Sequence, residues 1–165
     1  MALHPVFVHF HTGILTAAAV LAICSLIMRL VFREGIRTPG TRMAKIFHEF
    51  DIFIYWGSII GFLGLIAGAV TGFMDWPMEA LLDNPYMRFK ILWSAVTMQI
   101  YVFLIFIRAK LGDRVWDTTS GFLIYGILVI VGGALMMIMG AMGGIAVYNT
   151  SILEPILDWL GLPWP

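Results

Sequence analysis

The sequence predicts an all-α protein, an integral membrane four-helix bundle with a C-terminal interfacial amphipathic segment. Of its 165 residues, 61% are hydrophobic and only 12% are charged. A soluble domain usually has about 45–50% apolar and about 25% charged residues. The mean hydropathy is +0.93, and the apolar residues gather in four long runs. One small core cannot bury so many apolar side chains, so we expect the chain to lie in a bilayer and to bind lipids.

Each of the four runs is long enough to cross a membrane as a helix. A crossing takes about 20 residues, because a helix rises about 1.5 Å per residue. The runs cover residues 7–32, 50–74, 88–108 and 119–148, and are joined by the more polar segments 33–45, 75–85 and 109–118. The fourth run exceeds one crossing, so we expect it to tilt or to project from the bilayer.

The predicted bundle occupies residues 1–150 and is followed by a tail, residues 151–165. Within the tail, ILEPILDWLGLPWP (152–165) has apolar residues at helical spacing and two tryptophans. Tryptophan favours the boundary between membrane and water. The pattern therefore predicts an interfacial helix along the outer surface.

The lysines and arginines predict the orientation. Eight of the ten lie at the pole where the first run ends, and only Arg88 and Lys90 lie at the other pole. Positive side chains favour the cytoplasmic side of a prokaryotic cell membrane. Both termini are therefore predicted to be extracytoplasmic.

Small residues follow one face of two spans. They are Gly57, Gly61, Gly64, Gly68 and Gly72 in the second span, and Gly132, Gly140 and Gly144 in the fourth. Such residues let helix backbones approach closely, which is the usual means of helix association in lipid. Tight packing within the bundle is one interpretation. A groove for a flat cofactor or for another subunit's helix is the other.

Three histidines, His4, His9 and His11, fall within HPVFVHFHTG (4–13) at the start of the first span. With about 100° per residue, His4 and His11 share a face, and His9 lies roughly 140° from His4. Together with Asp75 they are candidate ligands for copper or zinc, with sulfur available to copper from Met74, Met78 and Met87. His4 and His9 are also candidate haem b ligands. A third interpretation is that all three are amphipathic residues at headgroup level.

The membrane interior has few polar side chains. No Asp, Glu, Lys or His falls at mid-depth, where Thr97 and Gln99 are the main polar residues. We expect Gln99 to hydrogen-bond a neighbouring helix. The lack of an intramembrane charge path argues against a pump, an antiporter or a stand-alone channel. The net charge of zero gives no nucleic-acid signature, and no hydrolase, ATPase or dinucleotide motif occurs.

At HPVFVHF the chain resembles a widespread, poorly characterised family of four-span prokaryotic membrane proteins that opens with His-Pro-x-x-Val-His-Phe-Pro. TGFMDW (71–76) and GGIAVYN (143–149) resemble two further motifs of that family. Its fold is grouped loosely with di-haem b-type cytochromes. The resemblance covers roughly residues 4–150 and implies a four-span fold, with His4 and His9 at the positions of the family's paired histidines.

Two residues depart from the family's pattern. His11 stands where the family usually has proline, and Lys90 stands where it tends to have a third-span histidine. That histidine is the natural partner of a first-span haem ligand. Lys90 is expected to pair with Asp75 or Asp83 instead.

The leading functional hypothesis is a non-catalytic, accessory integral subunit of a larger membrane oxidoreductase complex. A respiratory complex and a copper membrane monooxygenase both fit. Glycine-lined helices, amphipathic ends and the missing charge path motivate it. Its partners would be membrane lipids and the other subunits of a hetero-oligomer. One alternative is a b-type haem cytochrome or electron-transfer subunit, and another is a small copper- or zinc-binding membrane protein.

Overall fold

The computed structural model describes residues 4–76, 79, 83 and 85–148, and gives no side-chain environment for residues 4–5, 85–86 and 143–148. The described residues are almost entirely helical and contain no strand. The long helices are α1 (His4–Val31), α3 (Arg42–Asp75), α5 (Pro85–Leu111) and α6 (Thr119–Tyr148). A short helix α2 (Arg33–Arg37) and a 3₁₀ helix η1 (Gly112–Trp116) lie in two of the connections.

The predicted all-α bundle is confirmed, and its four spans match the four long helices. Among the described residues, Val6–Val31, Arg42–Asp75, Met87–Trp116 and Thr119–Met142 are long and apolar enough to cross a membrane. The main difference is that α3 begins eight residues before the predicted 50–74. Thr41 explains this start, because its Oγ1 accepts a hydrogen bond from the Ala44 N–H at 3.1 Å and caps the helix. The predicted interfacial tail, 151–165, lies outside the described residues.

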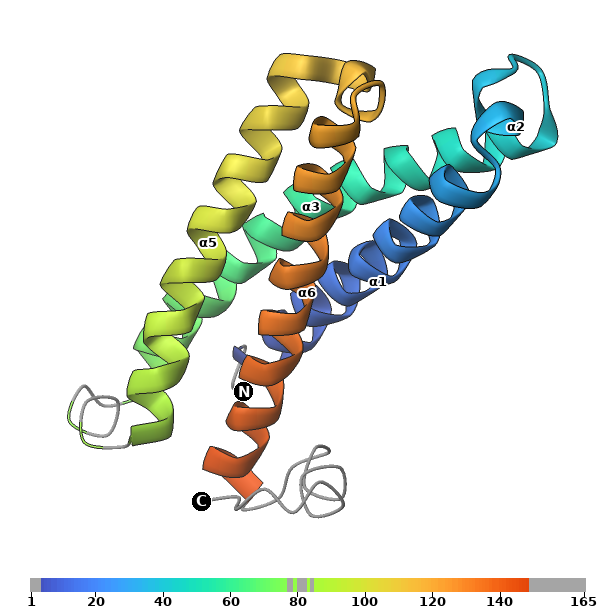
Figure 1. Ribbon diagram of the computed structural model, residues 1–165. Coiled ribbons are helices and arrows are strands. Elements are labelled where there is room, and N and C mark those ends of the chain that lie inside the picture. Colours follow the sequence, from blue (N-terminus) through green and yellow to red (C-terminus); the bar gives the residue numbers. More distant parts are fainter. Residues whose placement is uncertain (1–3, 77–78, 80–82, 84, 149–165) are drawn as a thin grey trace, which may run out of the picture.

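The four long helices form a bundle in which neighbouring helices run antiparallel, and α1 has the most extensive contacts with the others. α1 packs along both α3 and α6, α5 packs along α6, and α3 meets α5 more sparsely. Figure 1 shows α1 with α3 and α5 with α6 as two pairs inclined to one another. One end of the bundle carries the start of α1 and is here named the His11 end. The opposite end, where α5 finishes, is named the Arg108 end.

α1 packs against the row of glycines on α3, which are Gly57, Gly61, Gly64, Gly68 and Gly72 and are here named the glycine stripe. A methyl group built on Gly64 would lie 2.8 Å from His11 Cβ, and one built on Gly68 would lie 2.9 Å from His11 Cε1. A methyl on Gly61 would collide with the Leu15 side chain. The predicted tight packing is therefore confirmed for these glycines. On α6, Gly132 faces the Tyr101 ring and Gly133 faces Ala19.

A buried charge pair joins the helices at the Arg108 end. Asp51 of α3 is 2% exposed and forms an ion pair with Arg108 of α5. The indole Nε1 of Trp116 donates to Asp51 Oδ1 at 2.6 Å, and Arg108 Nη2 also donates to Asp113 at 2.7 Å. The Trp116 ring packs edge-on against Tyr125 of α6 with centroids 5.3 Å apart. This cluster fixes α3, α5, η1 and α6 relative to one another.

Candidate functional site

The N-terminal histidines lie on different faces of α1. His9 is exposed, whereas His11 is only 3% exposed and packs against the glycine stripe of α3. His4 begins α1, and its side-chain environment is outside the described part of the chain. The predicted separation of His9 from His11 around the helix is thus confirmed. A single ion cannot be held by both without a change in α1.

The predicted metal site remains a prediction. Among the described residues, no group of three or more His, Cys, Asp or Glu side chains is close enough to hold a metal ion. Asp75 is exposed at the end of α3, and His11 is buried beneath α3. The side-chain environment of His4 lies outside the described residues. The set of His4, His9, His11 and Asp75 is therefore untested.

Haem ligation through His4 and His9 is also untested. His9 does not line the cavity between the four long helices, whereas His11 and Lys90 do. An ammonium group, such as that of Lys90, is not among the usual axial ligands of haem iron. The described side chains therefore do not supply the facing pair of ligands that the resemblance implies.

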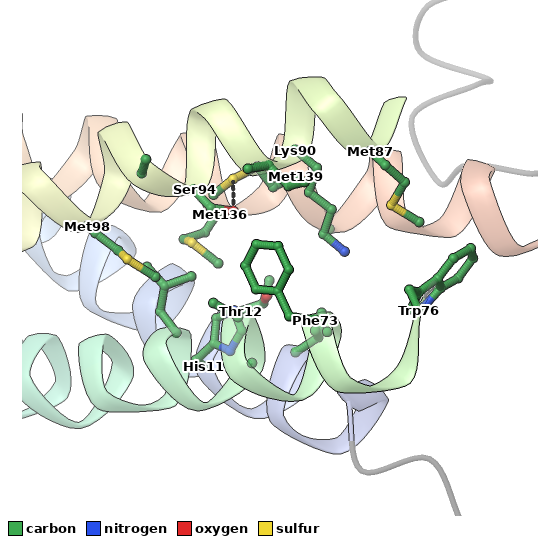
Figure 2. A pocket seen from close by; sticks show the side chains of 18 residues that line it. His11, Thr12, Phe73, Trp76, Met87, Lys90, Ser94, Met98, Met136 and Met139 are labelled. Atoms are coloured by element: carbon green, nitrogen blue, oxygen red, sulfur yellow. Dashed lines mark hydrogen bonds between the residues drawn. The ribbon is translucent and has the colours of Figure 1, made fainter. Parts of the chain in front are cut away.

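A cavity of about 220 Å³ lies at the His11 end, between all four long helices. Its larger and polar lining residues are His11 and Thr12 of α1, Phe73 of α3, the α3 C-cap residue Trp76, and Lys90 of α5. The remaining lining is almost wholly apolar. In Figure 2, α1 and α3 form one wall and α5 and α6 form the other. The end of the glycine stripe, Gly68 and Gly72, also borders this cavity, so part of the stripe packs helices and part lines an open space.

Lys90 is the cation of this cavity. Figure 2 shows its ammonium nitrogen directed into the space between the helix pairs. Among the described residues it forms no ion pair, although Asp75 and Asp83 are both described. The expected pairing of Lys90 with one of these carboxylates is therefore not observed. The position of Lys90 in a cavity depends on the packing of four helices, which the sequence pattern alone does not show.

Methionine sulfur surrounds the cavity. Four of its lining residues are Met87, Met98, Met136 and Met139. The Ser94 hydroxyl donates to Met139 Sδ at 3.2 Å. Methionine is unbranched and polarisable, so such walls adapt to ligands of irregular shape. Of the candidate sulfur ligands in the sequence, Met74 is 78% exposed and lies outside this lining, whereas Met87 is within it.

The outward face of α5 is the second notable feature. In the most apolar stretch of α5 only 17% of the residues are buried, against 33–44% in the other three spans. Exposed residues repeat along it at steps of three and four, and they are Leu92, Ala95, Gln99, Val102 and Phe106. We name these five residues the α5 stripe. Such spacing is typical of a helix face that packs against another helix.

Gln99 sits at the middle of the α5 stripe. It is exposed and has no hydrogen-bond partner among the described residues. Thr97, two residues earlier, is fully buried, and its hydroxyl donates to the Trp93 carbonyl at 2.8 Å. Within the described part of the chain Gln99 therefore bonds no other helix, and the expectation that it hydrogen-bonds a neighbouring helix stays a prediction. No known protein family, curated protein or solved structure matches the chain.

Proposed function

We propose that this chain is a non-catalytic integral subunit of a larger membrane oxidoreductase complex, and that the α5 stripe docks against a transmembrane helix of a neighbouring subunit. The observation that carries the proposal is the exposed amide of Gln99. Gln99 lies fourteen residues after Pro85, or about 21 Å along a helix that needs roughly 30 Å to cross the hydrocarbon layer. An amide at that depth has no water to bond.

An unpaired amide facing lipid is costly. Transfer of such a group to an apolar medium without a hydrogen bond costs roughly 2–7 kcal/mol. A polar side chain or backbone group on an adjacent subunit removes that cost, which is how polar residues associate helices in membranes. Lipid tails offer no such partner. Gln99 therefore supports a protein neighbour on this face in place of lipid.

The rest of the stripe suits a packed helix. Ala95 is small and lets a second backbone approach closely. Phe106 is 60% exposed and Leu92 is 62% exposed, one on each side of Gln99 along the helix. Together they give an apolar contact that surrounds one polar group. This arrangement fixes the register of a partner helix, because only one register pairs the amide.

The oxidoreductase class and the membrane orientation rest on the sequence. The resemblance to a family grouped with di-haem b-type cytochromes supports the class, and a respiratory complex or a copper membrane monooxygenase both fit it. The lysine and arginine asymmetry supports termini outside the cytoplasm of a prokaryotic cell. The four membrane-length helices support a multi-pass integral protein.

The proposal is tested by purification of the tagged native protein in mild detergent. We expect redox subunits to copurify with the wild type. A hydrogen bond of about 0.6–2 kcal/mol between membrane helices predicts that Gln99→Leu weakens their retention about 3- to 30-fold. Val70→Leu is the matched control, since Val70 is 53% exposed on α3, away from the stripe, and should change nothing.

Two results would contradict the proposal. One is a wild-type chain that runs alone as an 18.5 kDa monomer from native membranes. The other is a complex that contains only copies of this chain, shown by mixing two differently tagged forms. Because Gln99→Leu removes an exposed polar group, the isolated variant should unfold no more easily than the wild type. Its thermal unfolding therefore separates lost docking from lost folding.

A further inference from the structure

We propose that the cavity at the His11 end binds the hydrocarbon chain of a membrane lipid whose anionic head group pairs with Lys90. The cavity shares only Ala95 with the α5 stripe, and the proposal does not depend on the docking of that stripe. The cavity of about 220 Å³ is lined by apolar side chains, with Lys90 as its cationic group among the described residues. Such a lining selects a ligand that is mostly apolar and carries one negative charge.

The charge of Lys90 is the first step of the argument. Its ammonium nitrogen points into the cavity and has no carboxylate within ion-pair distance among the described residues. Burial of an unpaired charge is strongly unfavourable. A phosphate or carboxylate oxygen from a ligand compensates the charge and forms short, charge-assisted hydrogen bonds.

A second polar group faces the same cavity. The Thr12 hydroxyl is buried and has no hydrogen-bond partner among the described side chains and backbone. Buried hydroxyls are normally hydrogen-bonded, so an unpartnered one in a cavity wall points to a missing polar atom. Thr12 comes from α1 and Lys90 from α5, so the two groups approach the cavity from opposite walls.

The depth of Lys90 fits a lipid head group. Lys90 lies five residues after the first residue of α5, or about 7.5 Å along the helix. Trp76, which also lines the cavity, is the C-cap residue of α3 at the same end of the bundle, and tryptophan favours the membrane boundary. The head group of a lipid is found at this depth.

The inner part of the cavity fits a hydrocarbon chain. It extends from Trp76 inward to Leu65, eleven residues along α3 or about 16 Å. Met98 and Met136 line this deeper part and adapt to a flexible chain. Phe73, which is 50% exposed, stands where α3 and α5 meet sparsely, so a lipid can enter sideways from the bilayer.

The test is native mass spectrometry of the full-length chain in detergent, titrated with phosphatidylglycerol or phosphatidylcholine of the same chain lengths. We expect the wild type to retain phosphatidylglycerol about tenfold better, the factor that one charge-assisted hydrogen bond carries. Lys90→Met should remove that preference, and Lys90→Arg should keep it. Arg88→Met is the matched control, because Arg88 is exposed on the same end of α5.

A further variant tests whether the hydrocarbon chain of the lipid occupies the cavity. Ala69→Phe places a ring in the cavity wall and should lower retention of both lipids, with helix content unchanged by circular dichroism. Inorganic phosphate at millimolar concentration should not displace phosphatidylglycerol. Equal retention of phosphatidylglycerol by Lys90→Met and Arg88→Met would overturn the proposal. Displacement by free phosphate, or equal binding of the two lipids by the wild type, would overturn it as well.

Discussion

Trp116 of η1 donates a hydrogen bond of 2.6 Å to the carboxylate of Asp51 on α3, across 65 residues of sequence. The same carboxylate forms an ion pair with Arg108 of α5. These bonds lie where α3 and α5 otherwise make few contacts. The buried polar cluster, rather than apolar packing alone, therefore holds these two helices together at the Arg108 end.

Trp116→Phe should destabilise the bundle by about 1–3 kcal/mol, because it removes one hydrogen bond to a buried charge while retaining an aromatic ring. Unfolding of the detergent-solubilised protein by a denaturing detergent measures the change. Trp56→Phe is the control, since Trp56 is 57% exposed on α3 and should cost under about 0.5 kcal/mol. Equal costs for the two variants would show that the indole hydrogen bond contributes nothing.

Asp51→Ala should lower the free energy of unfolding by about 3–5 kcal/mol, because among the described residues it leaves the buried Arg108 guanidinium with Asp113 as its one carboxylate partner. The double variant Asp51→Leu, Arg108→Met should cost less than the sum of its single variants, since no unpaired charge is left. The same denaturing-detergent titration measures all of them. Strict additivity would mean that the two residues do not act as a pair.

Gly64→Ala should separate α1 from α3, because the added methyl would lie 2.8 Å from His11 Cβ. Overpacking of this kind costs about 1–3 kcal/mol. Gly13→Ala has nothing within 4 Å of the added methyl and should instead stabilise α1 by about 0.5–1 kcal/mol. Thermal unfolding compares the two variants. A neutral Gly64→Ala would show that α1 does not need this close approach.

The purified chain should show no Soret band and less than about one copper or zinc ion per chain. The physical reason is that His9 is exposed and does not share the cavity of His11 and Lys90. A visible spectrum and elemental analysis check both points. A Soret band that disappears when His4 and His9 are replaced by alanine would establish the cytochrome alternative. Stoichiometric metal lost in His11→Ala would establish the metal-binding one.

Hydropathy predicted the helices well, because lipid requires each span to satisfy its own backbone hydrogen bonds. The span 119–148 coincides with α6, whereas α3 begins earlier than its apolar run because Thr41 caps a polar first turn. Capping is independent of hydropathy, so the apolar pattern could not reveal that start. Glycine spacing likewise predicted the close packing on α3, since a stripe of small residues has a direct steric meaning.

The candidate site depends on how the helices are rotated and aligned against one another, which the sequence pattern does not show. Asp51 stands near the start of the apolar run 50–74, and nothing in its sequence neighbours shows that Arg108 and Trp116 will contact it. Similarly, the rotation of α5 decides that Lys90 faces the cavity and that Gln99 faces outward. The outward position of Gln99 became visible only once the buried face of α5 was known.

Site-specific photo-crosslinking in native membranes tests the central claim most directly. A photoreactive phenylalanine analogue at Phe106, within the α5 stripe, should crosslink the chain to another protein subunit. The same analogue at Val70 on α3, which is 53% exposed, should yield lipid adducts alone. Lipid adducts at both positions, with no protein crosslink at Phe106, would contradict a subunit that docks through α5.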